Sequence, residues 1–373
     1  MTISSVHPVA AGRLLSLDVM RGMIMILLCA ESCAVYVSLQ NLNMGQPAAA
    51  IVDQFFHHPW HGLRFWDLVQ PAFMFMAGAA LYISYSRKLE KGISWADNFN
   101  HILFRSFKLL LCGLALHCVY AGKPVWELWN VLTQLAFTTL LAYLIINRPA
   151  AWQILFSIGL LLLTECLYRY ILVPGFDQPF VESHNFGAYT DLLLMGKINS
   201  DGWVAINAIP TAAHTIWGVL AGKLLVSNHT SAYKIKALLL AGIIGLCIGF
   251  GLDLSGITPI IKRISTSSFV FASGGWVLIM LALAYWLVDV KQYVRYVWVF
   301  SVIGMNAIFI YLFFETVGVQ WLNGVVSVFT GDMLHTLLGM PVNIAAVLSA
   351  LVTWFAEWSL CYWLYKHKIF FKL

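Results

Sequence analysis

Ten long runs of apolar residues, separated by more polar segments, dominate the sequence. A helix needs about 20 apolar residues to cross the hydrocarbon core of a bilayer, and these runs are close to that length. A transmembrane β-barrel would instead show short segments of alternating polarity. We therefore predict an all-α, polytopic membrane protein in which residues 1–373 form a single transmembrane domain. The ten predicted spans are 14–37, 65–86, 101–121, 126–146, 151–172, 203–226, 235–252, 268–289, 296–317 and 342–366.

Basic residues are distributed unevenly between the two sides of the predicted bundle. Cytoplasmic loops of membrane proteins are enriched in lysine and arginine, so this asymmetry sets the orientation. We predict that both termini are cytoplasmic, which requires an even number of spans and agrees with ten. The predicted cytoplasmic side carries Arg13, Arg87, Lys88, Lys91, Arg148, Lys234, Lys236, Lys291, Arg295, Lys366, Lys368 and Lys372. The opposite side carries Arg64, Lys123, Lys197, Lys262 and Arg263, with the acidic residues Asp177, Glu182, Asp191 and Asp201.

The longest predicted connections, at about 38–64, 173–202 and 318–341, all lie on the extracytoplasmic side. Long loops in a compact fold usually carry function, so we expect the acceptor or ligand site on that side. The stretch 318–341 is weaker than the ten spans, and we expect a re-entrant or surface-lying segment there. Its interrupting residues are Gly324, Gly331, Asp332 and His335.

The amino-acid composition excludes several classes of protein. The chain is 60% hydrophobic and only 10% charged, with a mean hydropathy of +0.79. A soluble enzyme, a disordered chain or a nucleic-acid-binding protein needs far more polar surface, so these classes are excluded. The net charge of +5 therefore reports orientation rather than an anionic partner. We expect no cleavable signal peptide and interpret the seven cysteines, none in a CxxC motif, as buried spectators.

Ionisable residues within the first and third spans are candidates for function, because charge is costly at bilayer depth. Asp18 and Arg21 form either an internal ion pair at the inner interface or, through Arg21, a contact to a phosphorylated ligand. Glu31 must pair, protonate or face a wet cavity. Arg105 and Lys108 either extend their side chains to the interface or form a basic mouth for nucleotide phosphates.

The densest polar cluster is FFHHPWHGLRFWDLVQPAF, at the outer entrance to the second span. It contains His57 and His61 with a four-residue spacing, Asp67, and Pro71, which we expect to kink the helix below Asp67. The spacing permits a metal site, but no third ligand is indicated, so we expect none. The alternatives are satisfied interfacial histidines or a histidine that acts in proton transfer or as a nucleophile.

Four further polar residues stand in or near predicted spans and loops. Asn306 and Glu315 belong to the span at 296–317, where helix–helix hydrogen bonding is the alternative to a role in binding. Asn185 and Asp191 lie in the acidic outer loop, where the alternative is a solvated surface.

Taken together, these residues resemble the heparan-α-glucosaminide N-acetyltransferase family and its bacterial relatives. The resemblance extends from Arg13 to Leu373. It is carried, in order, by RLLSLDVMRG, HHPWHGLRFWDLVQPAFMFMAGAAL, NFGAYTDLLLMG, IPTAAHTIWGVLAGKLL, GMNAIFIY and LYKHKIFFKL.

The resemblance implies a ten-span core that takes acetyl groups from cytoplasmic acetyl-CoA and delivers them across the membrane to the amino group of a terminal glucosamine. The family's essential histidine corresponds to His57, three residues before Trp60. We expect Asp67 or Glu31 to orient this catalytic imidazole. The expected substrate-binding residues are Trp60, His61, Asn185, Asp191, Asn306 and Glu315, and the expected donor-binding residues are Arg21, Arg105 and Lys108.

The sequence departs from the family at positions that concern the acceptor. Glu31 and Ser32 replace a frequent asparagine, Leu132-Thr133-Gln134 lacks the arginine of an LQR motif, and Phe314 replaces a histidine of the animal members. We therefore expect an acetyl-CoA-dependent acetyltransferase acting on an extracytoplasmic amino sugar or glycan, in a bacterial inner membrane. An O-acetyltransferase with the same donor and a small-molecule transporter are the alternatives, and a homodimer is left open.

Overall fold

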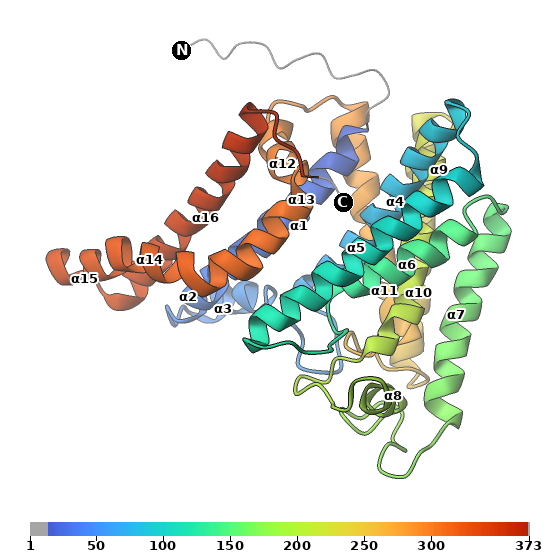
Figure 1. Cartoon of the computed structure of the whole chain (residues 1–373), viewed down its shortest axis with the longest axis horizontal. Coiled ribbons are helices and arrows are strands. Elements are labelled where there is room, and N and C mark those ends of the chain that lie inside the picture. Colours follow the sequence, from blue (N-terminus) through green and yellow to red (C-terminus); the bar gives the residue numbers. More distant parts are fainter. Residues whose placement is uncertain (1–13, 372–373) are drawn as a thin grey trace.

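The computed structural model describes residues 14–371 of the chain as a bundle of helices (Figure 1). Within this range there is no strand, and the only β-type pairing consists of two isolated bridges. Arg13 and Lys372, both predicted to be cytoplasmic, lie outside the described residues. Eight helices among the described residues are long and apolar enough to cross a membrane. The prediction of an all-helical, polytopic membrane protein is therefore confirmed, whereas the orientation stays a prediction.

The helices follow the predicted apolar runs closely. In chain order they are α1 (Leu15–Ser32), α2 (Val35–Gln40), α3 (Gln46–Asp53), the 3-10 turn η1 (Phe65–Leu68), α4 (Val69–Glu90), α5 (Trp95–Ala121), α6 (Val131–Leu144), α7 (Ala150–Tyr170), α8 (Phe186–Met195), η2 (Ala205–Asn207), α9 (Ala208–Val226), α10 (Ser231–Leu254), α11 (Ser267–Ala284), η3 (Tyr285–Val290), α12 (Val297–Gly304), α13 (Ala307–Phe313), η4 (Phe314–Leu322), α14 (Asn323–Ser327), η5 (Val328–Asp332), α15 (Met333–Leu338) and α16 (Val342–Lys366).

Two of the ten predicted spans do not meet the length and composition of a membrane span, so ten spans stay a prediction. The first, α1, contains Asp18, Arg21 and Glu31, and it ends at Ser32 where the chain turns into α2. The fourth, α6, has only 14 residues. Both pack inside the bundle, where neighbouring helices rather than lipid can surround their polar groups.

The prediction for the ninth span is wrong in its bounds. The run 296–317 is broken at Asn306, between α12 and α13, and helix then continues without interruption over Ala307–Leu338. Two segments of this long helix, η4 and η5, have π-type hydrogen bonding, which occurs mostly in short pieces and often near functional sites. The interrupting residues of 318–341 therefore do not end the helix: Gly331 and Asp332 lie in the π-type segment η5, and Gly324 and His335 lie in the α-helical segments α14 and α15.

Close helix packing positions the second span. Gly218 of α9 lies against α4, where a Cβ atom at this position would come within 2.1 Å of the Phe75 carbonyl oxygen. Gly78 of α4 makes the reciprocal approach, 2.0 Å from the Thr215 carbonyl oxygen. Such contacts require glycine and bring helix backbones together in membranes. They hold α4, which begins two residues after Asp67, against α9.

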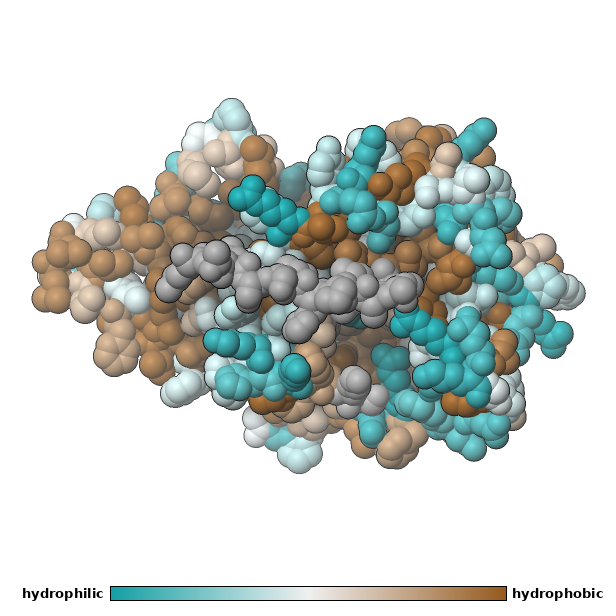
Figure 2. All heavy atoms as spheres, turned by 90° about the horizontal axis from the view of Figure 1, so that it is seen from above, coloured by the Kyte–Doolittle hydropathy of each residue, from teal (hydrophilic) through white to brown (hydrophobic). Residues whose placement is uncertain are grey.

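The bundle has two parts, visible side by side in Figure 1. Helices α1, α12, α13 and α16 form the part drawn at the left, and α4 to α11 form the part at the right, with α8 at the lower edge. Seen from above, hydrophilic residues gather on the upper end, whereas the arm at the left is largely hydrophobic (Figure 2). This distribution suits a protein whose flank faces lipid and whose upper end faces water.

Candidate active site

His57 lies at the centre of a buried polar cluster on the loop between α3 and η1. Its Nδ1 atom is 3.0 Å from Asp67 Oδ1 and 3.0 Å from Lys262 Nζ. The ammonium of Lys262 also lies 3.5 Å from Asp67 Oδ1, so the three side chains form one triangle. A histidine whose Nδ1 contacts a fixed carboxylate can present Nε2 as a base.

The Asp67 carboxylate is held in place by backbone groups. Its Oδ2 atom accepts hydrogen bonds from the N–H groups of His58, at 3.2 Å, and Arg64, at 2.9 Å. Asp67 itself is 0% exposed, so the loop is folded around its carboxylate. Pro71 lies in the first turn of α4, where the 3-10 turn η1 passes into α-helix. The irregularity predicted at Pro71 thus falls at a helix start, where a missing N–H is tolerated.

Lys262 is the residue that sequence reasoning missed as part of this site. It was identified only as one basic residue of an outer loop, and no motif marks it. The structure brings it to His57 because the two loops pair: His61 bridges Ile261, and the Gly62 N–H donates to the Ile260 carbonyl at 2.8 Å. The contact between Lys262 and His57, which are 205 residues apart in the chain, depends on this pairing.

The surroundings of His57 and Lys262 set the protonation of these two basic side chains. Burial, together with the positive charge of Lys262, lowers the pKa of His57 from 6.5 to about 4, against the opposing effect of Asp67. Burial also lowers the pKa of Lys262 to about 8, with Asp67 opposing the shift. At neutral pH His57 is therefore uncharged, and Lys262 is mainly protonated beside Asp67.

A cavity of about 220 Å³ opens next to His57. Two carboxylates line it, those of Glu31 and Glu315. Glu31 accepts a hydrogen bond of 3.0 Å from Trp66 Nε1, and Glu315 accepts one from the Tyr120 hydroxyl. The other lining residues are largely aromatic or polar: Leu28, Val69, Gln70, Phe73, Trp129, Asn130, Val131, Trp203, Lys262 and Tyr311. We call this the outer cavity.

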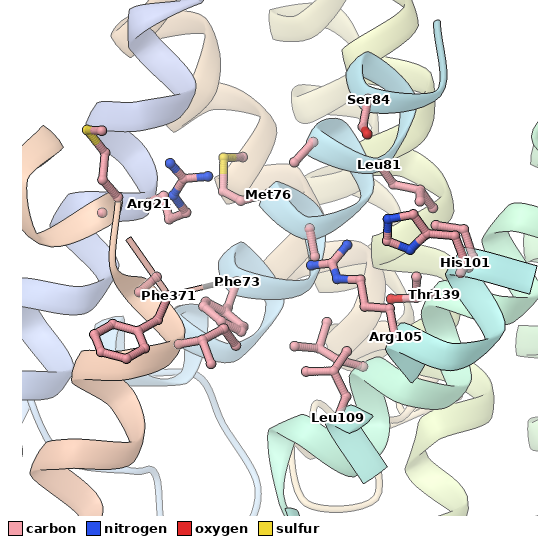
Figure 3. Close-up of a pocket in the computed structure, with 18 of the residues that line it drawn as sticks. Arg21, Phe73, Met76, Leu81, Ser84, His101, Arg105, Leu109, Thr139 and Phe371 are labelled. Atoms are coloured by element: carbon pink, nitrogen blue, oxygen red, sulfur yellow. The ribbon is translucent and has the colours of Figure 1, made fainter. Parts of the chain in front are cut away.

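A second cavity of about 360 Å³ lies deeper along α4, lined in part by Arg21, Ser84, Lys88, His101 and Arg105. Figure 3 shows the guanidinium groups of Arg21 and Arg105 reaching into it from opposite sides. Arg21 also binds Asp18, at 2.9 Å. A neighbouring hollow of about 580 Å³ shares Arg21, Ser84 and Lys88 and adds Arg87 and Lys91, which makes the entrance strongly basic. We call this the inner cavity.

Phe73 lines both the outer and the inner cavity. It lies on α4, one helical turn below Gln70, and its ring points into the inner cavity beside Phe371 (Figure 3). The two cavities therefore meet at one aromatic side chain in the middle of the bundle.

Several residues predicted to bind substrate lie away from the outer cavity. Trp60 Nε1 donates to the Phe180 carbonyl at 2.8 Å, and His61 binds Asp253 at 2.7 Å. His57 and His61 thus contact different carboxylates and do not converge on one point. Lys108 places its ammonium 4.6 Å from the Phe104 ring centre and does not line the inner cavity.

The remaining predicted residues support the walls. Asn185 caps α8 by accepting from the Ala188 N–H at 3.1 Å. Asp191 accepts from Trp129 Nε1 at 2.6 Å and so fixes one wall of the outer cavity. Asn306 binds backbone groups of the C-terminal segment, the Ile369 carbonyl and the Phe371 N–H, both at 3.0 Å.

Comparison with known proteins identifies the family of the chain. The family model described as heparan-alpha-glucosaminide N-acetyltransferase, catalytic, matches residues 13–252, which include His57 and Asp67. The heparan-alpha-glucosaminide N-acetyltransferases of Mus musculus and Homo sapiens are each 24% identical to the chain over 324 residues, covering 69% of this chain and 48% of each relative. The chain thus spans about half the length of these relatives. It belongs to the family of heparan-α-glucosaminide N-acetyltransferase catalytic domains.

Proposed function

We propose that the protein transfers an acetyl group from cytoplasmic acetyl-CoA to the amino group of an extracytoplasmic amino sugar, such as a terminal glucosamine. The observation that carries the proposal is the meeting of two chemically different cavities at Phe73. One holds a neutral histidine beside two carboxylates, and the other is basic. A bacterial inner membrane, with the basic cavity on the cytoplasmic side, is part of the same proposal.

The inner cavity suits the donor. Acetyl-CoA carries several phosphate charges at one end and an acetyl thioester at the end of a long, flexible arm. Arg21, Lys88 and Arg105 line the basic entrance, and charge-assisted hydrogen bonds to phosphate are strong. With its phosphates held there, the arm would extend past Phe73 and bring the thioester towards His57.

The outer cavity suits an amine acceptor. Glu31 and Glu315 present carboxylates to it, and these attract an ammonium group more strongly than a neutral hydroxyl. The rings of Trp129, Trp203 and Tyr311 provide flat apolar surfaces against which a sugar ring can pack. This composition favours N-acetylation over O-acetylation with the same donor.

His57 would act as the proton acceptor. With its Nδ1–H directed to Asp67, its Nε2 atom can remove a proton while the amine nitrogen attacks the acetyl carbonyl carbon. The C–S bond then breaks, CoA leaves as a thiolate that takes up a proton, and an amide is formed. In a two-step route, Nε2 itself receives the acetyl group and passes it to the amine.

The direct test uses purified protein in lipid nanodiscs with labelled acetyl-CoA and a panel of acceptors. Glucosamine-terminated sugars should become acetylated, whereas matched sugars without a free amine should not. Label found on hydroxyl groups instead would assign an O-acetyltransferase. Absence of transfer to every acceptor, together with absence of acetyl-CoA binding, would refute the proposal.

The donor site predicts the effect of a charge reversal. Arg105→Glu should weaken acetyl-CoA binding by about 10–100-fold, because a hydrogen bond to a charged group contributes about 1.5–3 kcal/mol. Lys108→Glu is the matched control, since Lys108 lies one turn away on α5 but outside the inner cavity. Titration calorimetry of both variants measures the difference. Equal affinity in the two variants would place the donor elsewhere.

The charge of Lys262 predicts a shift in the pH profile. His57 must be neutral to act as a base, so kcat/KM should rise with pH through an acid limb near the His57 pKa of about 4. Lys262→Met removes a positive charge that lowers this pKa, so the limb should move to higher pH. Exposed Lys123, on the same predicted side, gives the control variant Lys123→Met. An acid limb that stays in place in Lys262→Met would contradict the assignment.

A further inference from the structure

Two thiols and a carboxylate meet on the side of α1 that faces away from the outer cavity. Cys29 Sγ, Cys33 Sγ and a carboxylate oxygen of Glu357, on α16, all lie within 4.8 Å of one another. The three residues are 0%, 2% and 1% exposed. Among residues 14–371 they are the one group of three or more histidine, cysteine or acidic side chains arranged this closely.

The local backbone is shaped to build this cluster. Cys29 and Cys33 are one helical turn apart and so share a face of α1, whereas Glu31, between them, projects towards the outer cavity. Directly after Cys33, Ala34 has a φ of +60°, a left-handed conformation that costs an alanine about 1 kcal/mol. Gly318 leaves room for the carboxylate, because a Cβ atom there would lie 2.6 Å from Glu357 Oε1.

The hydrogen bonds within the cluster do not satisfy the carboxylate. Cys29 Sγ donates to Glu357 Oε2 at 2.8 Å, but Oε1 is buried and has no hydrogen-bond partner among the described residues. A buried polar atom without a partner is costly, and more so in a membrane-spanning helix such as α16. Thiols are weak donors, so the bond from Cys29 offsets little of this cost.

We propose that Cys29, Cys33 and Glu357 bind a zinc ion. Two thiolates and a bidentate carboxylate supply four donor atoms, of the kinds that zinc accepts, and the second carboxylate oxygen would then no longer lack a partner. The soft thiolates select zinc over magnesium or calcium. Binding releases three protons, two from the thiols and one from the carboxylic acid, so the neutral cluster and Zn²⁺ give a site with a net charge of −1. The ion would join α1 to α16. It would thereby fix the segment of α1 that carries Glu31, on the side opposite the outer cavity.

Elemental analysis of the untagged protein, purified from zinc-supplied cells and dialysed against metal-free buffer, tests the site. We expect about one zinc per chain. Cys33→Ser and Glu357→Gln should each lose the metal. Cys361→Ser should keep it, because Cys361 is also buried and lies one turn from Glu357 on α16 but is not one of the three ligands.

A second measurement keeps the proposal testable if the variants fail to fold. Wild-type protein produced with cobalt in place of zinc should show the intense near-ultraviolet absorption of thiolate–cobalt bonds. Wild-type protein that is folded and takes up neither ion would overturn the proposal and leave a hydrogen-bonded thiol–carboxylate cluster. Full zinc content in Cys33→Ser would overturn it equally. Neither measurement of metal content depends on acetyl transfer, so a failure of the zinc proposal can be distinguished from a failure of the proposed function.

Discussion

Replacing His57 with alanine is expected to reduce acetyl transfer by about 10²–10⁴-fold, the usual contribution of a positioned general base. His57 is the imidazole that contacts both Asp67 and Lys262 and lines the outer cavity. Acetyl-CoA binding should be largely preserved, because the basic residues of the inner cavity are untouched. Turnover and donor affinity, measured on the same preparation, separate these two effects.

The neighbouring histidines provide matched controls. His58 contributes its backbone N–H to Asp67, which His58→Ala retains, and its own Nδ1 has no hydrogen-bond partner among the described residues. His61 contacts Asp253 rather than the cavity. Both alanine variants should therefore lose much less activity than His57→Ala. A near-normal rate in His57→Ala, or an inactive His58→Ala, would show that the register of the motif is wrong.

Rapid quenching distinguishes the two chemical routes at His57. If the acetyl group passes through an acetyl-imidazole, incubation with labelled acetyl-CoA alone should leave an acid-labile label on His57 and on no other histidine. If transfer occurs directly in a ternary complex, no label should appear. In both cases Nε2 is the reacting atom, because Nδ1 faces Asp67 and Lys262.

The fold was predictable where the bilayer dictates it. Helices that cross a hydrocarbon core need long apolar runs, so α4, α5, α7 and α9 follow the predicted segments closely. The break at Asn306 was not predictable from hydropathy, and the contacts that Asn306 makes lie far away in the chain. Asn306 binds backbone groups of Ile369 and Phe371, and local hydropathy contains no signal for such a contact.

The candidate site was predictable only in part, for a related reason. His57 and Asp67 stand ten residues apart in one motif, so sequence and resemblance together identify them. Lys262 reaches His57 through the pairing of two separate loops, which the sequence does not encode locally. Asn185 and Trp60 were predicted to bind substrate, but their side chains form hydrogen bonds with backbone groups. Sequence alone does not distinguish these two uses of a polar atom in an outer loop.

Replacing Asp67 with asparagine should reduce turnover nearly as much as removing His57, although the side chains are almost the same size. One oxygen of Asp67 accepts two backbone N–H groups, from His58 and Arg64, and the other faces His57 Nδ1. The asparagine oxygen is needed at the backbone donors, so its NH₂ group must face His57. An NH₂ group donates to Nδ1, which moves the imidazole proton to Nε2.

The asparagine variant therefore holds His57 in the wrong tautomer, with no lone pair on the nitrogen that must accept a proton. We expect a loss of about 10²–10⁴-fold in kcat, with acetyl-CoA affinity and thermal stability close to wild type. Asp253→Asn is the matched control, because Asp253 binds His61 in the adjoining loop and should tolerate the change. If the Asp67→Asn protein keeps a near-normal kcat, Asp67 does not set the tautomer of His57, and the assignment of Nε2 as the proton acceptor would be contradicted.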